Sequence, residues 1–210
     1  MTLECISDAV RYGKAKDTVA LVQSALEAGF TAQDILDNGL LAGMSIIGAK
    51  FKSGEVFVPE VLIAARALNK GTELLKAKLL EEGVEPIGRA VICTVKGDMH
   101  DIGKNLVKMM LEGVGIEVID LGVDVDAERI VQAVREHEPQ ILLLSALLTT
   151  TMQEQQVVIE ALKVAGLRDK VKVMVGGAPV TQSYCDTIGA DIYTPDAATA
   201  AEVAKSLIGN

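Results

Sequence analysis

The chain has 210 residues, half of them hydrophobic, and a formal net charge of −9. This acidic balance disfavours nucleic acid and anionic membrane surfaces as partners. We expect no membrane span, because no apolar run approaches the ~20 residues that one needs, and no signal peptide. Three scattered cysteines fit reduced thiols better than a disulfide framework, so we expect a cytoplasmic protein.

Residues 1–82 have the periodicity of helices. Apolar residues recur at steps of three or four along 36–51 and again along 62–79, and shorter periodic stretches occupy 3–12 and 17–28. Thr31 and Asp34 are typical of an N-terminal capping pair, and Pro59 suits the first turn of a helix. These patterns predict a four-helix bundle domain spanning residues 1–82.

Residues 83–88 predict a linker, because they contain two glycines and a proline and have no periodicity. From residue 89 to residue 210, short apolar runs alternate with helical patterns, which predicts a parallel sheet covered by helices on both faces. A flavodoxin-like, five-stranded sheet of order 2-1-3-4-5 is the expected α/β fold, with its switch point between the first and third strands. The predicted strands are 90–95, 117–121, 141–145, 171–175 and 191–193.

A six-residue run from Asp98 to Gly103 follows the first predicted strand and precedes a predicted helix. It contains His100, one of only two histidines in the chain. Open parallel sheets bind ligands at such strand-to-helix loops. Because a metal-binding imidazole is usually hydrogen-bonded to a carboxylate or carbonyl, Asp98 and His100 form a candidate metal site.

Two further loops follow predicted strands at the same edge of the sheet. Residues 145–151 read Ser-Ala-Leu-Leu-Thr-Thr-Thr, and residues 176–179 read Gly-Gly-Ala-Pro. Glycines let the main chain approach a bulky ligand closely, and the hydroxyls can bind a phosphate or a buried ring. The three loops together suit a ligand with a long polar tail better than a compact substrate.

Each feature also has an ordinary structural explanation. A loop histidine can be solvated, the glycines can serve turns, and Asp98, Asp101 or the Thr149–Thr151 run can cap helices. His137 ends a polar helical segment and is expected to be exposed. The occurrence of all three loops at one predicted edge favours a binding site.

With these motifs the chain resembles corrinoid proteins of methanol, methylamine and methoxyaromatic methyltransferase systems, and the cobalamin module of methionine synthase. The resemblance covers nearly the whole chain. It implies that His100 binds cobalt as the lower axial ligand, that Asp98 hydrogen-bonds it, and that Thr151 completes the triad where methionine synthase has serine. The residues implied to bind the cofactor are Gly97, Asp98, Met99, His100, Asp101, Gly103, Ser145, Leu147, Thr149, Thr151, Gly176, Gly177 and Ala197.

The resemblance also assigns a role to the helical half. In methylcobalamin proteins a bundle caps the upper face of the corrin. Phe51 and Val58 align with the capping residues, and Phe57 is a further possibility. The alternative is that all three belong to the core of the bundle.

The function implied by the resemblance is methyl transport on cobalt. The cofactor is then cobalamin or a related corrinoid, as methylcobalamin or cob(I)alamin. The implied partners are a substrate-specific methyltransferase, an acceptor methyltransferase that uses folate or a thiol, and a reductive activation protein. We find no acid–base pair or metal-ligand cluster that would activate a substrate, so we expect a carrier within a methyltransferase system.

Three alternatives remain open at this point. The cobalamin-binding subunit of an adenosylcobalamin mutase shares the sheet and the histidine motif, but usually lacks the preceding bundle. A cobalamin-sensing regulatory module joins a bundle to the same sheet, but usually adds a DNA-binding segment. A flavodoxin-like signalling domain without cofactor would leave His100 and the Ser145 loop unexplained.

Overall fold

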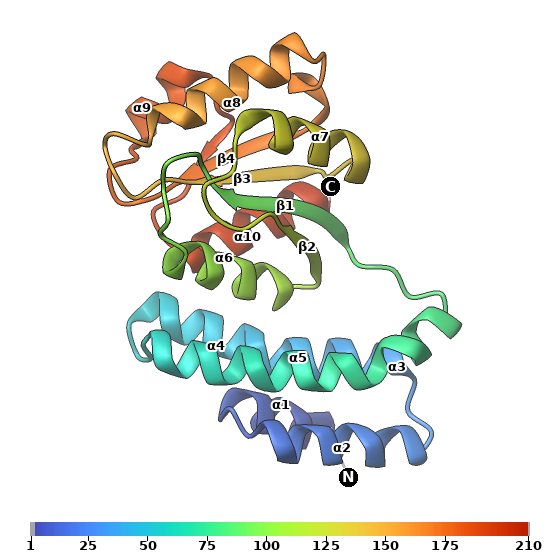
Figure 1. The fold of residues 1–210 in the computed structure, drawn as a ribbon. Helices are drawn as coiled ribbons and strands as arrows, with labels where there is room; N and C mark the ends of the chain where they lie inside the picture. Colours follow the sequence, from blue (N-terminus) through green and yellow to red (C-terminus); the bar gives the residue numbers. More distant parts are fainter. Residues whose placement is uncertain (1–2, 210) are drawn as a thin grey trace. The chain divides into compact units, whose positions relative to one another are not determined.

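The computed structural model describes residues 3–209, and the main division of the chain into two compact units lies between Pro86 and Ile87. The first unit is helical, and the second combines a sheet with helices (Figure 1).

The helical unit consists of four long helical stretches, one of which changes its winding along its length. Its elements are α1 (Leu3–Arg11), α2 (Ala15–Glu27), α3 (Ala32–Asp34), the π-helix η1 (Ile35–Leu41), α4 (Ala42–Ser53) and α5 (Val58–Glu81). The Thr31 side chain caps α3 by accepting the Asp34 N–H at 3.0 Å, as the sequence predicts. Pro59 lies in the first turn of α5, where its missing N–H costs no helical hydrogen bond.

The buried stripe of α5 differs at its start from the predicted one. Leu62 is 41% exposed, and Val61 is buried instead. Ala65, Leu68 and Leu79 are buried as predicted. Because a helix turns about 100° per residue, Val61 continues the buried face more closely than Leu62 does.

The second unit contains a fully parallel sheet. Its strands are β1 (Gly88–Thr94), β2 (Ile116–Asp120), β3 (Ile141–Ser145), β4 (Lys172–Gly176) and β5 (Ile192–Tyr193). The strand order is β2-β1-β3-β4-β5, which confirms the predicted topology. Its switch point lies between β1 and β3, which pair in register from Ala90–Ile141 to Thr94–Ser145.

Helices cover both faces of this sheet (Figure 1). Helices α7 (Ala127–His137), α8 (Gln153–Val164) and α9 (Gln182–Ile188) lie on one face, whereas α6 (Ile102–Glu112) and α10 (Ala197–Ile208) lie on the other. Alternate residues of β1 serve the two faces: Val91 and Cys93 join the core beneath α7 and α8, and Ile92 is buried on the other side. The sheet is therefore buried on both faces, which explains its continuous apolar strands.

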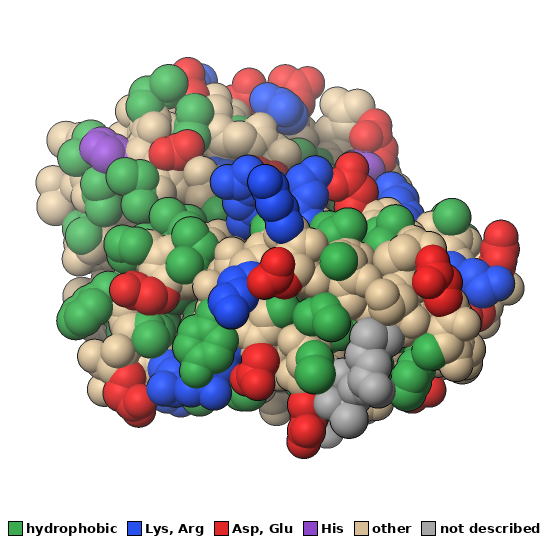
Figure 2. Space-filling view, turned by 90° about the horizontal axis from the view of Figure 1, so that it is seen from below, with side chains coloured by type: hydrophobic (Ala, Val, Ile, Leu, Met, Phe, Trp, Pro, Cys, Tyr) green, Lys and Arg blue, Asp and Glu red, His purple; other side chains and the backbone are tan. Residues whose placement is uncertain are grey.

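The face drawn in Figure 2 is chemically mixed. Hydrophobic, acidic and basic side chains lie beside one another over this face. None of the helices within residues 3–209 combines the length and hydrophobicity required to span a bilayer.

Candidate functional site

The loop that carries His100 leaves the carboxyl end of β1. Asp98 closes its first turn by donating its N–H to the carbonyl of Val95 at 3.2 Å, and Gly97 adopts a left-handed φ of 78° within it. At the end of the loop, the Thr94 hydroxyl donates to the carbonyl of His100 at 2.8 Å. The backbone of His100 is thus tied to Thr94, the last residue of β1.

The carboxylate of Asp98 is the centre of the site. It is fully buried and accepts four hydrogen bonds. Oδ1 lies 2.7 Å from Nδ1 of His100 and 3.1 Å from the same residue's N–H. Oδ2 accepts the hydroxyl of Thr151 at 2.6 Å and the N–H of Leu147 at 2.7 Å. The structure therefore brings together Asp98, His100 and Thr151, the three residues of the predicted triad.

These hydrogen bonds decide the protonation state of Asp98. Burial raises the pKa of the carboxyl, but the bonds from Thr151, Leu147 and His100 outweigh it and hold the pKa well below its usual range. Asp98 is therefore a carboxylate at neutral pH, able to accept a proton-bearing Nδ1 of His100.

The imidazole of His100 is buried at one end and open at the other. Its side chain is 51% exposed, although Asp98 beneath it is inaccessible to solvent. Since Nδ1 is bonded to Asp98, Nε2 is the nitrogen left for a metal ion. This is the arrangement in which a carboxylate fixes the orientation of a metal-binding histidine.

The second predicted loop reaches the site through its backbone and through Thr151. Ser145 ends β3, and its carbonyl accepts the N–H of Val95 at 3.1 Å, which joins the first and second loops. Leu147 is exposed and contributes its N–H to Asp98, whereas Thr149 is exposed at the loop tip. The hydroxyl run is thus divided: Thr151 faces inward and Thr149 outward.

The third loop runs tightly against the second. Gly177 has a φ of +129°, and a Cβ built on it would lie 1.7 Å from the carbonyl oxygen of Ala146. Only glycine fits here. By contrast, a Cβ on Gly176 would meet only an ordinary contact at 3.6 Å. Gly177 therefore lets the backbones after β3 and β4 approach each other at the carboxyl edge of the sheet.

Gln155 lies beneath these two loops and was not predicted. Its Nε2 donates to the carbonyls of Leu144 at 2.9 Å and Gly176 at 3.2 Å, while its Oε1 is buried without a partner among the described residues. The signal in the sequence was a polar residue in register with the apolar face of α8, formed by Val158, Ile159 and Leu162.

A second group that the sequence pattern does not reveal supports the start of α6. The side chain of Lys104 is only 2% exposed, and its Nζ lies 2.7 Å from both carboxylate oxygens of Asp120. It also donates to Oδ1 of Asn105 at 2.8 Å. Asp120 in turn accepts the N–H of Gly122, so this ion pair links the helix after His100 to the loop after β2.

The remaining predicted residues are distributed as follows. Met99 and Asp101 are exposed on the His100 loop, Gly103 lies in the first turn of α6, and Ala197 is the buried first residue of α10, which Asp196 caps as predicted.

In the helical unit, Phe51 and Val58 are half-buried, and Phe57 is 69% exposed. His137 ends α7 half-buried, and its carbonyl accepts a hydrogen bond from Arg89.

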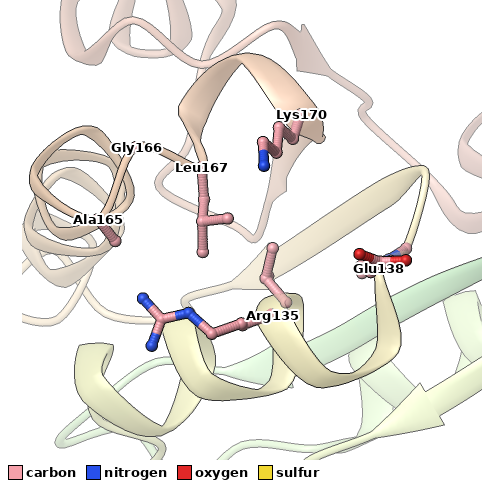
Figure 3. A pocket seen from close by; sticks show the side chains of 8 residues that line it. Arg135, Glu138, Ala165, Gly166, Leu167 and Lys170 are labelled. Carbon is pink, nitrogen blue, oxygen red and sulfur yellow. The ribbon is translucent and has the colours of Figure 1, made fainter.

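A pocket of about 430 Å³ lies elsewhere in the α/β unit (Figure 3). It is formed where α7 and α8 end, and Arg135, Glu138, Leu167 and Lys170 contribute to its wall. Because these segments precede β3 and β4, the pocket lies at the amino edge of the sheet and contains none of the predicted site residues.

Comparison with known proteins identifies the family. Two family models, each described as a B12 binding domain, match residues 2–76 and 88–204. The dimethylamine corrinoid protein of Methanosarcina barkeri is 44% identical over 208 residues, which cover 98% of this chain and 97% of the relative. The chain belongs to the B12-binding corrinoid proteins. Its cofactor is accordingly cobalamin or a related corrinoid.

Two further relatives support this assignment of the corrinoid protein. Trimethylamine corrinoid protein 1 of Methanosarcina acetivorans is 44% identical over 191 residues, covering 86% of this chain and 88% of the relative. A structure of the methanol:cobalamin methyltransferase complex MtaBC from Methanosarcina barkeri matches with a TM-score of 0.90 and 33% identity, covering 99% of this chain and 80% of that chain.

The residues around His100 fit a corrinoid. Exposed apolar side chains occur on the first and second loops and at the start of α6, and exposed apolar surface marks binding sites where it is contiguous. These side chains are Met99, Ile102, Leu147 and Leu148. Together with a fixed imidazole, they suit a large, partly apolar ring with a metal ion at its centre. The spare buried acceptor of Gln155 and the bare backbone at Gly176 fit a polar tail.

Proposed function

We propose that this corrinoid protein carries a methyl group between a substrate-specific methyltransferase and an acceptor methyltransferase. The observation that carries the proposal is His100, whose Nδ1 lies 2.7 Å from a buried carboxylate at the switch point of a B12-binding sheet. Identity of 44% to a dimethylamine corrinoid protein over nearly the whole chain favours small methylated amines as the source of the methyl group.

The bound corrinoid would supply a cobalt ion able to accept and release a methyl group. The protein's own contribution is to place Nε2 of His100 below that ion and to control the proton on Nδ1. Proton loss from the His100–Asp98 pair would favour ligation, and proton uptake would favour release, because metal ligation requires neutral imidazole. Thr151 donates to Asp98 and so moderates the basicity of the pair.

We further propose that residues 1–82 form a domain that covers the upper face of the cofactor, and that the residues from 83 up to the start of β1 at Gly88 link this domain to the sheet. A family model of its own, matching residues 2–76, supports a role for this unit in B12 binding. Phe51 and Val58 are the proposed covering residues. In the full chain, Phe51→Ala should speed photolysis of bound methylcobalamin, whereas Phe30→Ala, an equivalent change in the same unit, should not.

The proposed partners are the two methyltransferases and a reductive activation protein, in the cytoplasm and without nucleic acid. The three cysteines support this location, since no disulfide joins them and two are buried as thiols. Among the described residues no group of three or more His, Cys, Asp or Glu side chains could hold a further metal ion.

The test is reconstitution of the full chain with cobalamin under reducing conditions. Dimethylamine, trimethylamine and methanol would be offered separately, with and without the matching donor methyltransferase, while cobalt absorbance is followed. We expect fast methylation only when a donor enzyme is present, and with an amine rather than methanol. Fast methylation by this chain alone, in a preparation free of other methyltransferases, would contradict the carrier role.

A further inference from the structure

Asp124 has a backbone conformation that is unusual for its residue type. It lies in the loop between β2 and α7, with a φ of +52°. In residues 3–209 only one other non-glycine residue, Glu138, has a positive φ. A left-handed conformation is unfavourable for a side chain with a Cβ, although Asp and Asn tolerate it best. Some interaction in the folded chain must therefore hold Asp124 in this conformation.

Asp124 makes two hydrogen bonds to the backbone on the two sides of Asp98. Its carboxylate Oδ1 accepts the N–H of Gly97 at 2.7 Å, and its own N–H donates to the carbonyl of Asp98 at 3.0 Å. The left-handed turn lets the side chain and the main chain of one residue reach both positions. Asp98 is thus held on either side of its α carbon.

The loop that carries Asp124 is itself firmly attached to β1. The Val125 N–H donates to the carbonyl of Thr94 at 3.1 Å, and the Thr94 N–H donates to the carbonyl of Gly122 at 3.0 Å. Gly122 is fixed in turn by Asp120, the partner of buried Lys104. Through these contacts, Asp124 connects the loop of Asp98 and His100 to β2 and α6.

We propose that Asp124 is a positioning residue for the cobalt ligand. By fixing the backbone of Asp98, it sets the place of the carboxylate that orients His100, and it does so without contacting the cofactor. The proposal rests on the proposed ligand role of His100. None of the cofactor-binding residues implied by the sequence lies in the loop between β2 and α7.

The test uses the full chain with Asp124→Gly and Asp124→Asn. Glycine removes the carboxylate and also the cost of the left-handed φ, so a change reports the lost hydrogen bond rather than strain. Asparagine keeps an acceptor oxygen and tolerates this φ. Glu138→Gly is the matched control, because Glu138 shares the positive φ but lies at the end of α7.

Two measurements are needed. Without cofactor, hydrogen exchange of the Gly97 amide reports the bond to Asp124 itself. With cobalamin in the cobalt(II) state, electron paramagnetic resonance reports the ratio of imidazole-ligated to unligated cobalt. We expect Asp124→Gly to raise the exchange rate and lower the ligated-to-unligated ratio, each by about tenfold, as loss of one charge-assisted hydrogen bond predicts. Asp124→Asn should restore both to within about threefold of the unsubstituted chain.

The proposal would be overturned if Asp124→Gly kept the ligation ratio of the unsubstituted chain, or if Glu138→Gly lowered it equally. Failure of Asp124→Asn to recover any of the loss would also overturn the hydrogen-bond explanation. A lack of imidazole coupling in the unsubstituted chain would instead contradict the proposed function. The exchange of Gly97, measured without cofactor, would then still support or overturn the contact with Asp124.

Discussion

The hydroxyl of Thr151 donates to Oδ2 of Asp98 at 2.6 Å, although the two residues lie 53 positions apart in the sequence. The other oxygen of the same carboxylate accepts Nδ1 of His100. A threonine at the end of the loop after β3 thereby acts on a histidine in the loop after β1. The two loops meet because β1 and β3 are neighbours at the switch point of the sheet.

Thr151→Val should destabilise the chain by removing a donor from a buried charge. We expect the free energy of unfolding of the cofactor-free protein to fall by about 1.5–3 kcal/mol, the usual worth of a hydrogen bond to a charged group. Thr151→Ser keeps the hydroxyl and should lose much less. Urea unfolding of the three proteins at neutral pH measures the difference. A larger loss for Thr151→Ser than for Thr151→Val would show that the methyl group of Thr151, rather than its hydroxyl, matters.

The ion pair of Lys104 and Asp120 should behave as a buried pair. Lys104→Met leaves Asp120 with the N–H of Gly122 and, as its charged partner among the described residues, the more distant Lys108, 3.5 Å away; it should cost about 3–5 kcal/mol of unfolding free energy. The double variant Lys104→Met with Asp120→Leu should recover part of this loss, because no charge is then left unpaired. Chemical denaturation of the single and double variants forms a complete cycle. Strictly additive losses would argue against coupling between the two side chains.

Asp120 should also make stability depend on pH. Burial raises the pKa of its carboxyl, but Lys104 and the N–H of Gly122 outweigh this and lower the pKa below the ordinary value. A lowered folded-state pKa gives stability that is fully present above the unfolded-state pKa of about 3.9 and is lost as the pH falls through the folded value. The free energy of unfolding of the unsubstituted chain should therefore exceed that of Asp120→Asn at neutral pH, and this difference should shrink on acidification. Urea unfolding of both proteins between neutral and acidic pH measures it. A difference that grows towards acid would reverse the sign assigned here.

Gly177→Ala should be far more damaging than Gly176→Ala. An added Cβ at Gly177 would overlap the carbonyl oxygen of Ala146 in a conformation that L side chains rarely adopt, whereas Gly176 has room. We expect the Gly177 variant to lose about 3 kcal/mol or more through backbone displacement, compared with about 1 kcal/mol for its neighbour. Thermal unfolding and cobalamin affinity should both separate the pair. Similar behaviour of the two variants would show that the loops after β3 and β4 can move apart.

The sequence predicted the sheet and the loops at its edge well, for physical reasons. Strands that are buried on both faces consist of continuous apolar residues. For this reason the strand predicted at 141–145 has the same first and last residues as β3, Ile141–Ser145. Alternation with helices predicts a parallel sheet, and a domain of about 120 residues favours the flavodoxin-like order of its strands. Asp98 and His100 were recognisable because they are near neighbours in the chain, and Thr151 was placed by the resemblance.

The contacts that the sequence did not reveal join distant segments through single side chains. Nothing in the spacing of Asp124 indicates that it bonds Gly97, since that contact depends on the pairing of β1 with β2 and on a left-handed turn. The π-helix Ile35–Leu41 was likewise invisible in a pattern of three- and four-residue steps. A Cβ on Gly39 within it would lie only 3.1–3.2 Å from the side chain of Ile6, so close packing against α1 accompanies the altered winding.

The most direct test of the account is the identity of the nitrogen on cobalt. The full chain would be loaded with cobalamin whose own base carries a different nitrogen isotope, and the cobalt(II) form examined by electron paramagnetic resonance. The account predicts splitting from the unlabelled nitrogen of a protein imidazole, and its loss in His100→Ala while cofactor binding is weakened rather than abolished. Splitting that follows the isotope of the cofactor's own base would contradict ligation by His100 and, with it, the role assigned to Asp98 and Thr151.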